Sequence, residues 1–366
     1  MDIIVLGNGY DLAHGLPTRY VDFLDFINLI MDMSDKDLNN KINKHIIENI
    51  NNCLKNPEDK ILGELMDLIR DNFWIDHFNK EKMKKKENWI DFENEISNVI
   101  QSIDEHIKDN PDISINNCII TNIKDFIPMN FSTERKTYAE FRDKLLKDLN
   151  NFIRCFEIYL AEFVEKIHID AKFDTQNICY NPNNIKVISF NYTHTFQKFN
   201  RKERIDYHYI HGEAKIDNTV ENNNMVLGIG EYLEGEAKNK EIDFIAFKKY
   251  YQRILKQTGN KYRNWLKDTR GILSINNYII GHSLDITDKD ILKDLILHDK
   301  STSNTTIYYY NKNDLEKKIA NLVKIIGQEE LIKRTGEDNI IFKNQEEIYI
   351  EQINKQKRLI ADVLIF

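Results

Sequence analysis

The sequence predicts an α/β protein with a mostly parallel sheet and a large α-helical insertion between its first and second core strands. Short apolar runs, typical of buried parallel strands, alternate with helical patterns over much of the chain. A long stretch after the first of these runs carries only the periodicity of amphipathic helices. Five prolines and thirteen glycines are few for 366 residues, which favours long helices over an all-β fold with many tight turns.

The expected sheet begins with the apolar run Asp2-Ile3-Ile4-Val5-Leu6, which ends at the turn Gly7-Asn8-Gly9. Helical patterns over residues 288–297 and 314–326 lie among the later strands. Such alternation indicates βαβ units, so we expect a Rossmann-like core. The later runs with strand character are residues 185–190, 207–210, 225–227, 277–280 and 306–310.

Two apolar stripes at helical spacing predict long helices before the second strand. One stripe runs from Tyr138 to Ile167 and the other from Phe92 to Ile107, with apolar residues every three or four positions. We therefore expect three parts in the chain. They are a Rossmann-like nucleotide-binding core of residues 1–21 and 180–326, a helical insertion of residues 22–179, and a C-terminal helical extension of residues 327–366.

Composition and charge exclude several classes of protein. A net charge of −8 excludes a uniformly basic surface for nucleic acid. The sequence contains no run of eighteen apolar residues, so no membrane span is expected. Without a secretory signal pattern, we expect a cytoplasmic protein. Neither a Cys-x-x-Cys pair nor an obvious set of carboxylates is present, so we expect no metal. The cysteines Cys53, Cys118, Cys155 and Cys179 are then expected to be reduced thiols.

The turn Gly7-Asn8-Gly9 is the first candidate binding motif. A glycine turn after a buried strand brings backbone amides close to a phosphate, and Asp11 can bond ribose hydroxyls. The ordinary Gly-x-Gly-x-x-Gly fingerprint fails, because Leu12 stands at its sixth position. Two alternatives stay open: a simple tight turn, and an Asp11 that caps the next helix.

Three further polar turns follow predicted strands. Asn191 can orient a sugar hydroxyl or a water, or cap the next helix; His211 can act as a general base, or be structural. Gly281 and Ser283 form a small-residue turn, in which Ser283 contacts a ribose or caps a helix. Because the carboxyl ends of parallel strands meet at one edge of a sheet, we expect a nucleotide pocket there.

Taken in order, the motifs resemble the AbiH family of bacterial abortive-infection proteins directed against phage. The resemblance extends from the first strand to about Asp285. In the insertion motif, we expect Trp89 to pack, and Glu93 is a candidate to reach the pocket. The motifs that carry the resemblance are Gly7 to Thr18, Trp89-Ile90-Asp91-Phe92-Glu93, Ser189-Phe190-Asn191-Tyr192-Thr193, Ile210-His211-Gly212, Leu227-Gly228 and Gly281-His282-Ser283-Leu284-Asp285.

A more distant resemblance is to sirtuins and sirtuin-like NAD-hydrolysing defence domains. Their pattern Gly-Ala-Gly-x-Ser-x-x-x-Gly-Ile-Pro is similar in spacing to Gly7 through Pro17, with Asp11 at the serine position. They also have an asparagine after a strand and a His-Gly pair about twenty residues later, as at Asn191 and His211. The resemblance implies an NAD site, with Asn191 and His211 as the catalytic pair. Where those hydrolases have Asn-x-Asp, this chain has Thr193 in place of the aspartate.

The expected function is therefore an anti-phage NAD glycohydrolase, which breaks the nicotinamide–ribose bond of NAD and so depletes the infected cell. NAD is its substrate, and the expected partners are a phage-derived trigger, a partner subunit or a second copy of the chain. A nuclease is the rival enzyme. A nucleotide-binding sensor without chemistry is the rival that Thr193 keeps open.

Overall fold

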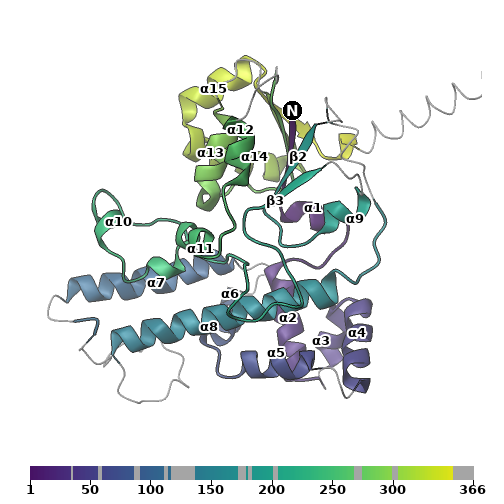
Figure 1. The fold of residues 1–366 in the computed structure, drawn as a ribbon, viewed down its shortest axis with the longest axis vertical. Coiled ribbons are helices and arrows are strands. Elements are labelled where there is room, and N and C mark those ends of the chain that lie inside the picture. The colour runs from purple at the N-terminus through teal and green to yellow at the C-terminus, as the bar shows by residue number, and fades with distance from the viewer. Residues whose placement is uncertain are drawn as a thin grey trace, which may run out of the picture. The chain divides into compact units, whose positions relative to one another are not determined.

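The computed structural model has an α/β fold, as predicted, and its residues group into two compact units (Figure 1). Unit 1 consists of Met1–Leu16, His168–Glu213 and Thr258–Phe366, and it contains the sheet. Unit 2 consists of Pro17–Ile167 and Ala214–Gln257 and is helical. The structure describes residues 1–33, 36–56, 60–85, 91–110, 114–116, 137–171, 179, 184–200, 205–267, 274–298 and 304–348.

The sheet of unit 1 has six strands, all parallel, in the order β3-β2-β1-β4-β5-β6. The chain moves outward from β1 to β3 and then returns to the other side of β1. The strand order therefore reverses between β1 and β4: the connection after β1 leads to one side of the sheet and the connection after β4 leads to the other. Open α/β sheets bind ligands at such a point. The strands are β1 (Asp2–Leu6), β2 (Ile185–Ser189), β3 (Asp206–Tyr209), β4 (Asn276–Ile280), β5 (Asn304–Tyr309) and β6 (Ile340–Asn344).

Both faces of the sheet are covered, which explains why β1 is apolar at successive positions. Ile3 and Val5 lie in one core cluster and Ile4 and Leu6 in the other, because successive strand residues point to opposite faces. Apolar side chains of α12, α13, α14 and α15 join the first cluster, and those of α1 and α9 join the second. These helices are α1 (Asn8–Ala13), α9 (Thr195–Phe199), α12 (Lys261–Lys267), α13 (Lys289–Ile296), α14 (Lys312–Ile326) and α15 (Gln328–Gly336), and the short helix η4 (Ile286–Asp288) precedes α13.

Two strand predictions differ from the structure. Residues 225–227 are buried but form no strand: the amide of Leu227 donates to the side chain of Gln252, and the carbonyl of Met225 accepts from Lys256. Side chains thus take the place of the neighbouring strand that was expected to hydrogen-bond the backbone of residues 225–227. Conversely, β6 was not predicted, since its residues lie in the expected helical extension; the described part of that extension contains α15 and then β6, which pairs with β5. Residues 349–366 lie outside the described chain.

Unit 2 is built around α8 (Tyr138–Ile158), which continues as the π-helix η1 (Tyr159–Val164). Thr137 and Glu140 cap its start reciprocally, as a capping box does. The other helices are α2 (Tyr20–Met31), α3 (Lys36–Lys41), α4 (Lys44–Lys55), α5 (Ile61–Ile69), α6 (Phe73–Lys85), α7 (Phe92–Asp109), α10 (Ala237–Lys240), η3 (Ile245–Phe247) and α11 (Lys249–Leu255). Among the described residues, no helix is both long and apolar enough to cross a membrane.

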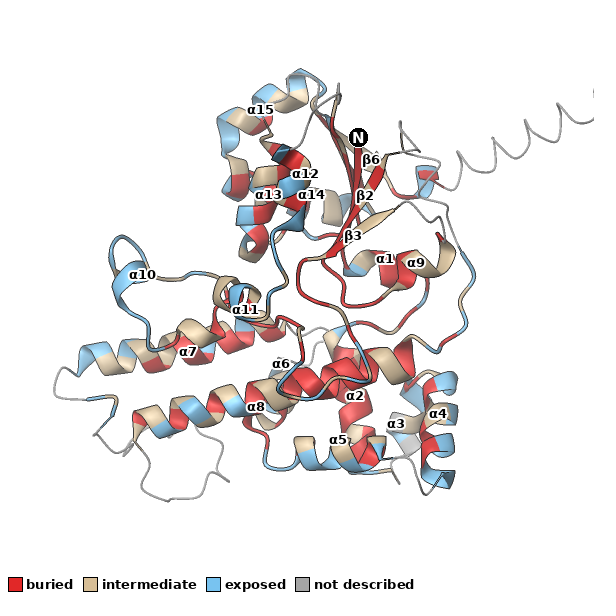
Figure 2. Cartoon of the chain, in the orientation of Figure 1, coloured by how far each residue is buried: buried red, intermediate tan, exposed pale blue. Residues whose placement is uncertain are grey.

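The C-terminal part of α8 is buried on every side, as the red ribbon in Figure 2 shows. Its two charged residues are paired with each other: Nη1 of Arg154 lies 2.7 Å from Oε2 of Glu157, and both side chains are almost fully buried. Glu157 also accepts from Asn218 and Asn223, and Arg154 donates to the carbonyl of Ile216. These bonds join residues 214–257 to the helices, whereas the sequence had assigned that segment to the sheet domain.

Candidate functional site

The turns after β1 and β4 pack against each other at the reversal point of the sheet. The amide of Gly7 donates to the carbonyl of Ile280, and the amide of Gly9 donates to the carbonyl of Gly281, at 3.0 and 2.8 Å. A Cβ added to Gly7 would lie 2.5 Å from Cα of His282, and one added to Gly9 would lie 2.8 Å from Cα of Gly281. Both glycines are therefore required for the close approach of two backbones, and these two amides serve that packing.

Gly281 has a further requirement. Its φ of +69° lies in the left-handed region, and a Cβ there would lie 2.2 Å from the amide nitrogen of Tyr10. Asn8 and Ser283, on either side of this contact, are both exposed, and the carbonyl of Ser283 accepts from Asn321 of α14. Asn8 and Ser283, two of the polar residues predicted for nucleotide binding, thus lie at the surface of the reversal point, beside the packed glycine backbone.

Asp11 is buried, with 1% of its surface exposed, although it was predicted to bond a ribose or cap a helix. Its Oδ2 accepts a hydrogen bond of 2.5 Å from the hydroxyl of Thr193, a residue of the turn after β2. A bond between a hydroxyl and a carboxylate at this distance is in the strong, charge-assisted class. Asp11 therefore links α1 to the turn after β2.

Asn191 is buried at the carboxyl end of β2, and it does not cap the next helix. That helix, α9, begins at Thr195 with His194 in the N-cap position. The amide Nδ2 of Asn191 instead donates to the carbonyl of Gly7 at 3.1 Å, which ties the β2 turn to the β1 turn. Its Oδ1 is buried and has no hydrogen-bond partner among the described residues. An unsatisfied buried acceptor costs about 1–3 kcal/mol, so this oxygen is a candidate ligand contact.

His211, at the end of β3, lies in a cluster with Asp288 and His282. Nε2 of His211 is 3.1 Å from Oδ1 of Asp288, and Nε2 of His282 is 3.6 Å from Oδ2 of the same carboxylate. All three side chains are buried. Phe190 packs edge-on against both imidazoles, with ring centroids 5.4 Å from His211 and 4.2 Å from His282. One carboxylate thus serves two histidines from different strand ends.

The structure brings together only part of the predicted set. Gly7, Gly9, Asp11, Asn191 and Gly281 are connected by the bonds and contacts above, all within unit 1. Sequence reasoning did not single out His282 or Asp288 as site residues. The only available signal was their position: both follow the apolar strand that ends at Ile280, as His211 follows its own strand.

The other candidates belong to unit 2 or to residues outside the described chain. Glu93 forms an ion pair of 2.7 Å with the buried Lys249, both in unit 2, while Trp89 and Cys118 lie outside the described residues. Within the described chain, no group of three His, Cys, Asp or Glu side chains could hold a metal ion. The described cysteines form no disulfide with one another, and burial raises the pKa of the Cys155 thiol far above its usual value. Cys155 is therefore not a nucleophile.

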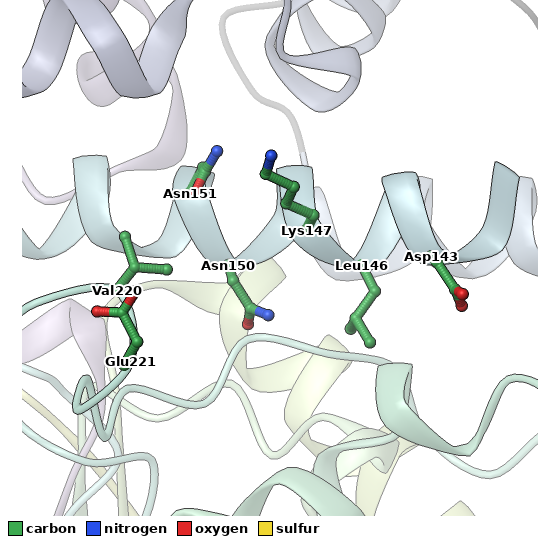
Figure 3. A pocket seen from close by; sticks show the side chains of 7 residues that line it. All are labelled: Asp143, Leu146, Lys147, Asn150, Asn151, Val220 and Glu221. Atoms are coloured by element: carbon green, nitrogen blue, oxygen red, sulfur yellow. The ribbon is translucent and has the colours of Figure 1, made fainter. Parts of the chain in front are cut away.

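A hollow of about 400 Å³ lies on unit 2 (Figure 3). Side chains of α8 line it together with Val220 and Glu221. Figure 3 shows Asn150 and Leu146 on the side of α8 that faces Val220 and Glu221. None of the predicted site residues lines this hollow. Its lining offers no buried nucleophile or base, so the carboxyl edge of the sheet remains the candidate site.

Comparison with known proteins gave one match. A family model described as "Bacteriophage abortive infection AbiH" matches residues 3–310, which include every residue of the candidate site. No curated protein and no solved structure matches the chain.

Proposed function

The chain belongs to the AbiH family of bacteriophage abortive-infection proteins, and we propose that it acts in that role by hydrolysing the nicotinamide–ribose bond of NAD. NAD is the substrate, and water is the second reactant. Loss of NAD would stop the metabolism of an infected cell before phage multiply. The family membership carries the anti-phage role, and the chemistry of the carboxyl edge supports the reaction.

The observation that carries the proposal is that Asn191 and His211 follow two neighbouring strands, β2 and β3, at the carboxyl edge of the sheet. Both are buried, and each is held by a partner that fixes its orientation: Gly7 for Asn191 and Asp288 for His211. The site thus offers an amide oxygen to a ribose hydroxyl or water, and an imidazole to take a proton. A general base of this kind contributes about 10²–10⁴ in rate.

The charges of the site suit the transition state. Cleavage of the glycosidic bond develops positive charge on the ribose, as in glycoside hydrolysis. The buried carboxylates of Asp11 and Asp288 are fixed by hydrogen bonds before the reaction begins. Fixed negative groups near a developing cation lower its free energy without reorganisation at the moment of reaction.

The experiment incubates purified protein with NAD and, separately, with RNA and DNA, and follows nicotinamide release and strand cleavage. His211→Gln is the test variant, because a glutamine amide can still donate to Asp288 but cannot accept a proton as a base. The matched control is His298→Gln, since His298 of unit 1 also uses Nε2 in a hydrogen bond, to the carbonyl of Leu266.

We expect nicotinamide release by the parent and by His298→Gln, and a loss of about 10²-fold or more in His211→Gln. Equal release by folded His211→Gln would remove the catalytic assignment. Cleavage of nucleic acid with intact NAD would replace the proposal with the nuclease. Binding of NAD without release of nicotinamide would replace it with the sensor.

A further inference from the structure

We propose that Asp288 is the positioning residue of His211, which it fixes in the tautomer whose Nδ1 can accept a proton, while His282 lies beside the other oxygen of the Asp288 carboxylate. The proposal rests on the proposed NAD hydrolysis for its catalytic meaning. The tautomer itself is a property of the folded chain and does not depend on the substrate.

The tautomer follows from the contact between His211 and Asp288. An ionised carboxylate only accepts hydrogen bonds, so the imidazole nitrogen that faces it must carry the proton. Nε2 of His211 faces Oδ1 of Asp288 at 3.1 Å. In the neutral ring, Nδ1 is then the acceptor nitrogen. Asp288 thereby decides which atom of His211 is the base.

His282 is fixed in the complementary way. The amide of Leu284 donates to Nδ1 of His282 at 2.9 Å, so the proton of the neutral ring lies on Nε2, the nitrogen near Oδ2 of Asp288. Leu284 has a φ of +59°, a left-handed conformation that a leucine rarely adopts. The hydrogen bond from its amide to His282 is one contact that holds this turn.

The position of Asp288 shows that its carboxylate is used for the histidines. Asp288 is the N-cap residue of α13, where an aspartate ordinarily accepts from the first amides of the helix. In the described chain, however, its side chain makes no capping hydrogen bond to α13. The carboxylate faces the two imidazoles instead, and the side chain of Asp285 caps the short helix η4 that leads into α13. The contact with the two histidines accounts for this orientation of the Asp288 side chain.

In the reaction, the oxygen of water forms a bond to C1′ of the nicotinamide-bearing ribose, and the bond from C1′ to the ring nitrogen breaks. The electron pair of that bond goes to nicotinamide, which leaves as a neutral molecule. The proton of the water goes to Nδ1 of His211. The imidazolium so formed is stabilised by the carboxylate of Asp288, and the other product is ADP-ribose.

The test is Asp288→Asn, which keeps the size of the side chain and lets its amide donate to Nε2 of His211. That bond favours the wrong tautomer, with the proton on Nδ1. The ¹⁵N chemical shifts of the His211 ring report the tautomer directly, and the loss of these signals in His211→Gln assigns them. Asp294→Asn is the matched control, because Asp294 lies on the same helix and bonds Tyr262 and Arg263.

We expect the proton on Nε2 in the parent and in Asp294→Asn, and on Nδ1 in Asp288→Asn. We also expect kcat of Asp288→Asn to fall by about 10⁴-fold, as for other histidines held in the wrong tautomer, with KM changed by less than about twofold. A proton on Nδ1 in the parent would overturn the proposal, and so would a kcat of folded Asp288→Asn within about tenfold of a parent that cleaves NAD.

The two readouts also separate the two proposals. A parent that cleaves no NAD would remove the proposed function, while the ring nitrogens of His211 would still decide the tautomer. Should Asp288→Asn fail to fold, the spectrum of the parent alone decides it, because only the predicted tautomer carries the proton on Nε2.

Discussion

The hydrogen bond between Thr193 and Asp11 joins two positions at which this sequence differs from the sirtuin pattern. In that pattern a serine stands at the position of Asp11 and an aspartate at the position of Thr193. Here the carboxylate and the hydroxyl have exchanged places, and they meet at 2.5 Å. The sirtuin pattern has one carboxylate and one hydroxyl at these two positions as well, in the reverse order.

The exchange can be tested by reversing it. Thr193→Asp alone puts a second carboxylate against the buried Asp11, and Asp11→Ser alone leaves the Thr193 hydroxyl without its acceptor. We expect each single change to destabilise the protein, Thr193→Asp the more strongly, by about 3 kcal/mol or more. The double variant restores one carboxylate and one hydroxyl, so we expect it to be more stable than Thr193→Asp.

Chemical denaturation of the parent, both single variants and the double variant gives the coupling free energy of the pair. A favourable coupling of about 1 kcal/mol or more is expected for groups in direct contact. Additive losses would show that the two positions do not compensate for each other.

The sequence could predict that the glycines at the carboxyl edge matter, but not the contact between backbones that requires them. The sequence indicates a turn at Gly7-Asn8-Gly9 and another at Gly281, because each follows an apolar run. The two turns touch because β4 pairs with β1, which places Asp2 beside Asn276, a residue 274 positions later in the chain. No local pattern encodes such a contact, so the sequence could not predict that the amide of Gly9 bonds the carbonyl of Gly281.

At the scale of elements, periodic patterns predicted four of the helices, α7, α8, α13 and α14, and most strands. α7 and α8 were expected from their apolar stripes, and five of the six strands from apolar runs. The errors fell on short segments. β6 is a five-residue edge strand of mostly partly buried residues. Residues 225–227 are buried but do not pair with a strand. A run of three to five apolar residues predicts burial, whereas its hydrogen-bond partners are set by tertiary contacts.

The stripe of α8 gives the clearest prediction at this scale. Phe152 is fully buried, and its ring lies 4.9 to 5.3 Å, centroid to centroid, from the rings of Phe23, Phe78 and Phe92. Removing a buried phenylalanine costs about 3–5 kcal/mol, and a carboxylate adds an unpaired buried charge. We expect Phe152→Asp to destabilise the protein by more than about 4 kcal/mol or to prevent folding.

Lys147→Asp is the matched control, because Lys147 is exposed on the same helix. We expect its free energy of unfolding to stay within about 0.5 kcal/mol of the parent. Circular dichroism melts of both variants make the comparison. A Phe152→Asp protein that melts with the parent would contradict the packing of α8 in unit 2.

At the scale of the whole molecule, the division of the chain was the least predictable feature. Residues 214–257 follow three strands of the sheet, yet they belong to the helical unit. Polar contacts are part of this attachment: Glu157 and Arg154 on α8 bond Asn218, Asn223 and the carbonyl of Ile216. Sequence periodicity reports apolar faces, so these buried polar bonds could not be predicted from it.

The stability of the molecule should depend on pH through Lys256. Burial lowers the pKa of Lys256 from 10.5 to about 8, although Glu157 opposes the shift. Between these pH values the unfolded chain binds more protons at this site than the folded chain, so folding becomes more favourable as pH rises from about 8 to about 10.5. The full effect of one such group is about 3 kcal/mol.

The measurement is the difference in unfolding free energy between the parent and Lys256→Met across that pH range, which cancels the titration of other groups. We expect the parent to gain stability relative to the variant as pH rises, and no change in the difference below about pH 7. A difference that is flat between pH 8 and 10.5, or that falls, would contradict the lowered pKa.

The central claim is that this AbiH protein stops phage by consuming NAD through His211. The most direct measurement is the NAD content and survival of cells that express the parent, His211→Gln or His298→Gln, sampled through a phage infection. We predict that NAD falls on infection with the parent and with His298→Gln, and that His211→Gln, expressed at the same level, keeps NAD high and loses protection. Full protection by the parent with unchanged NAD would contradict the claim.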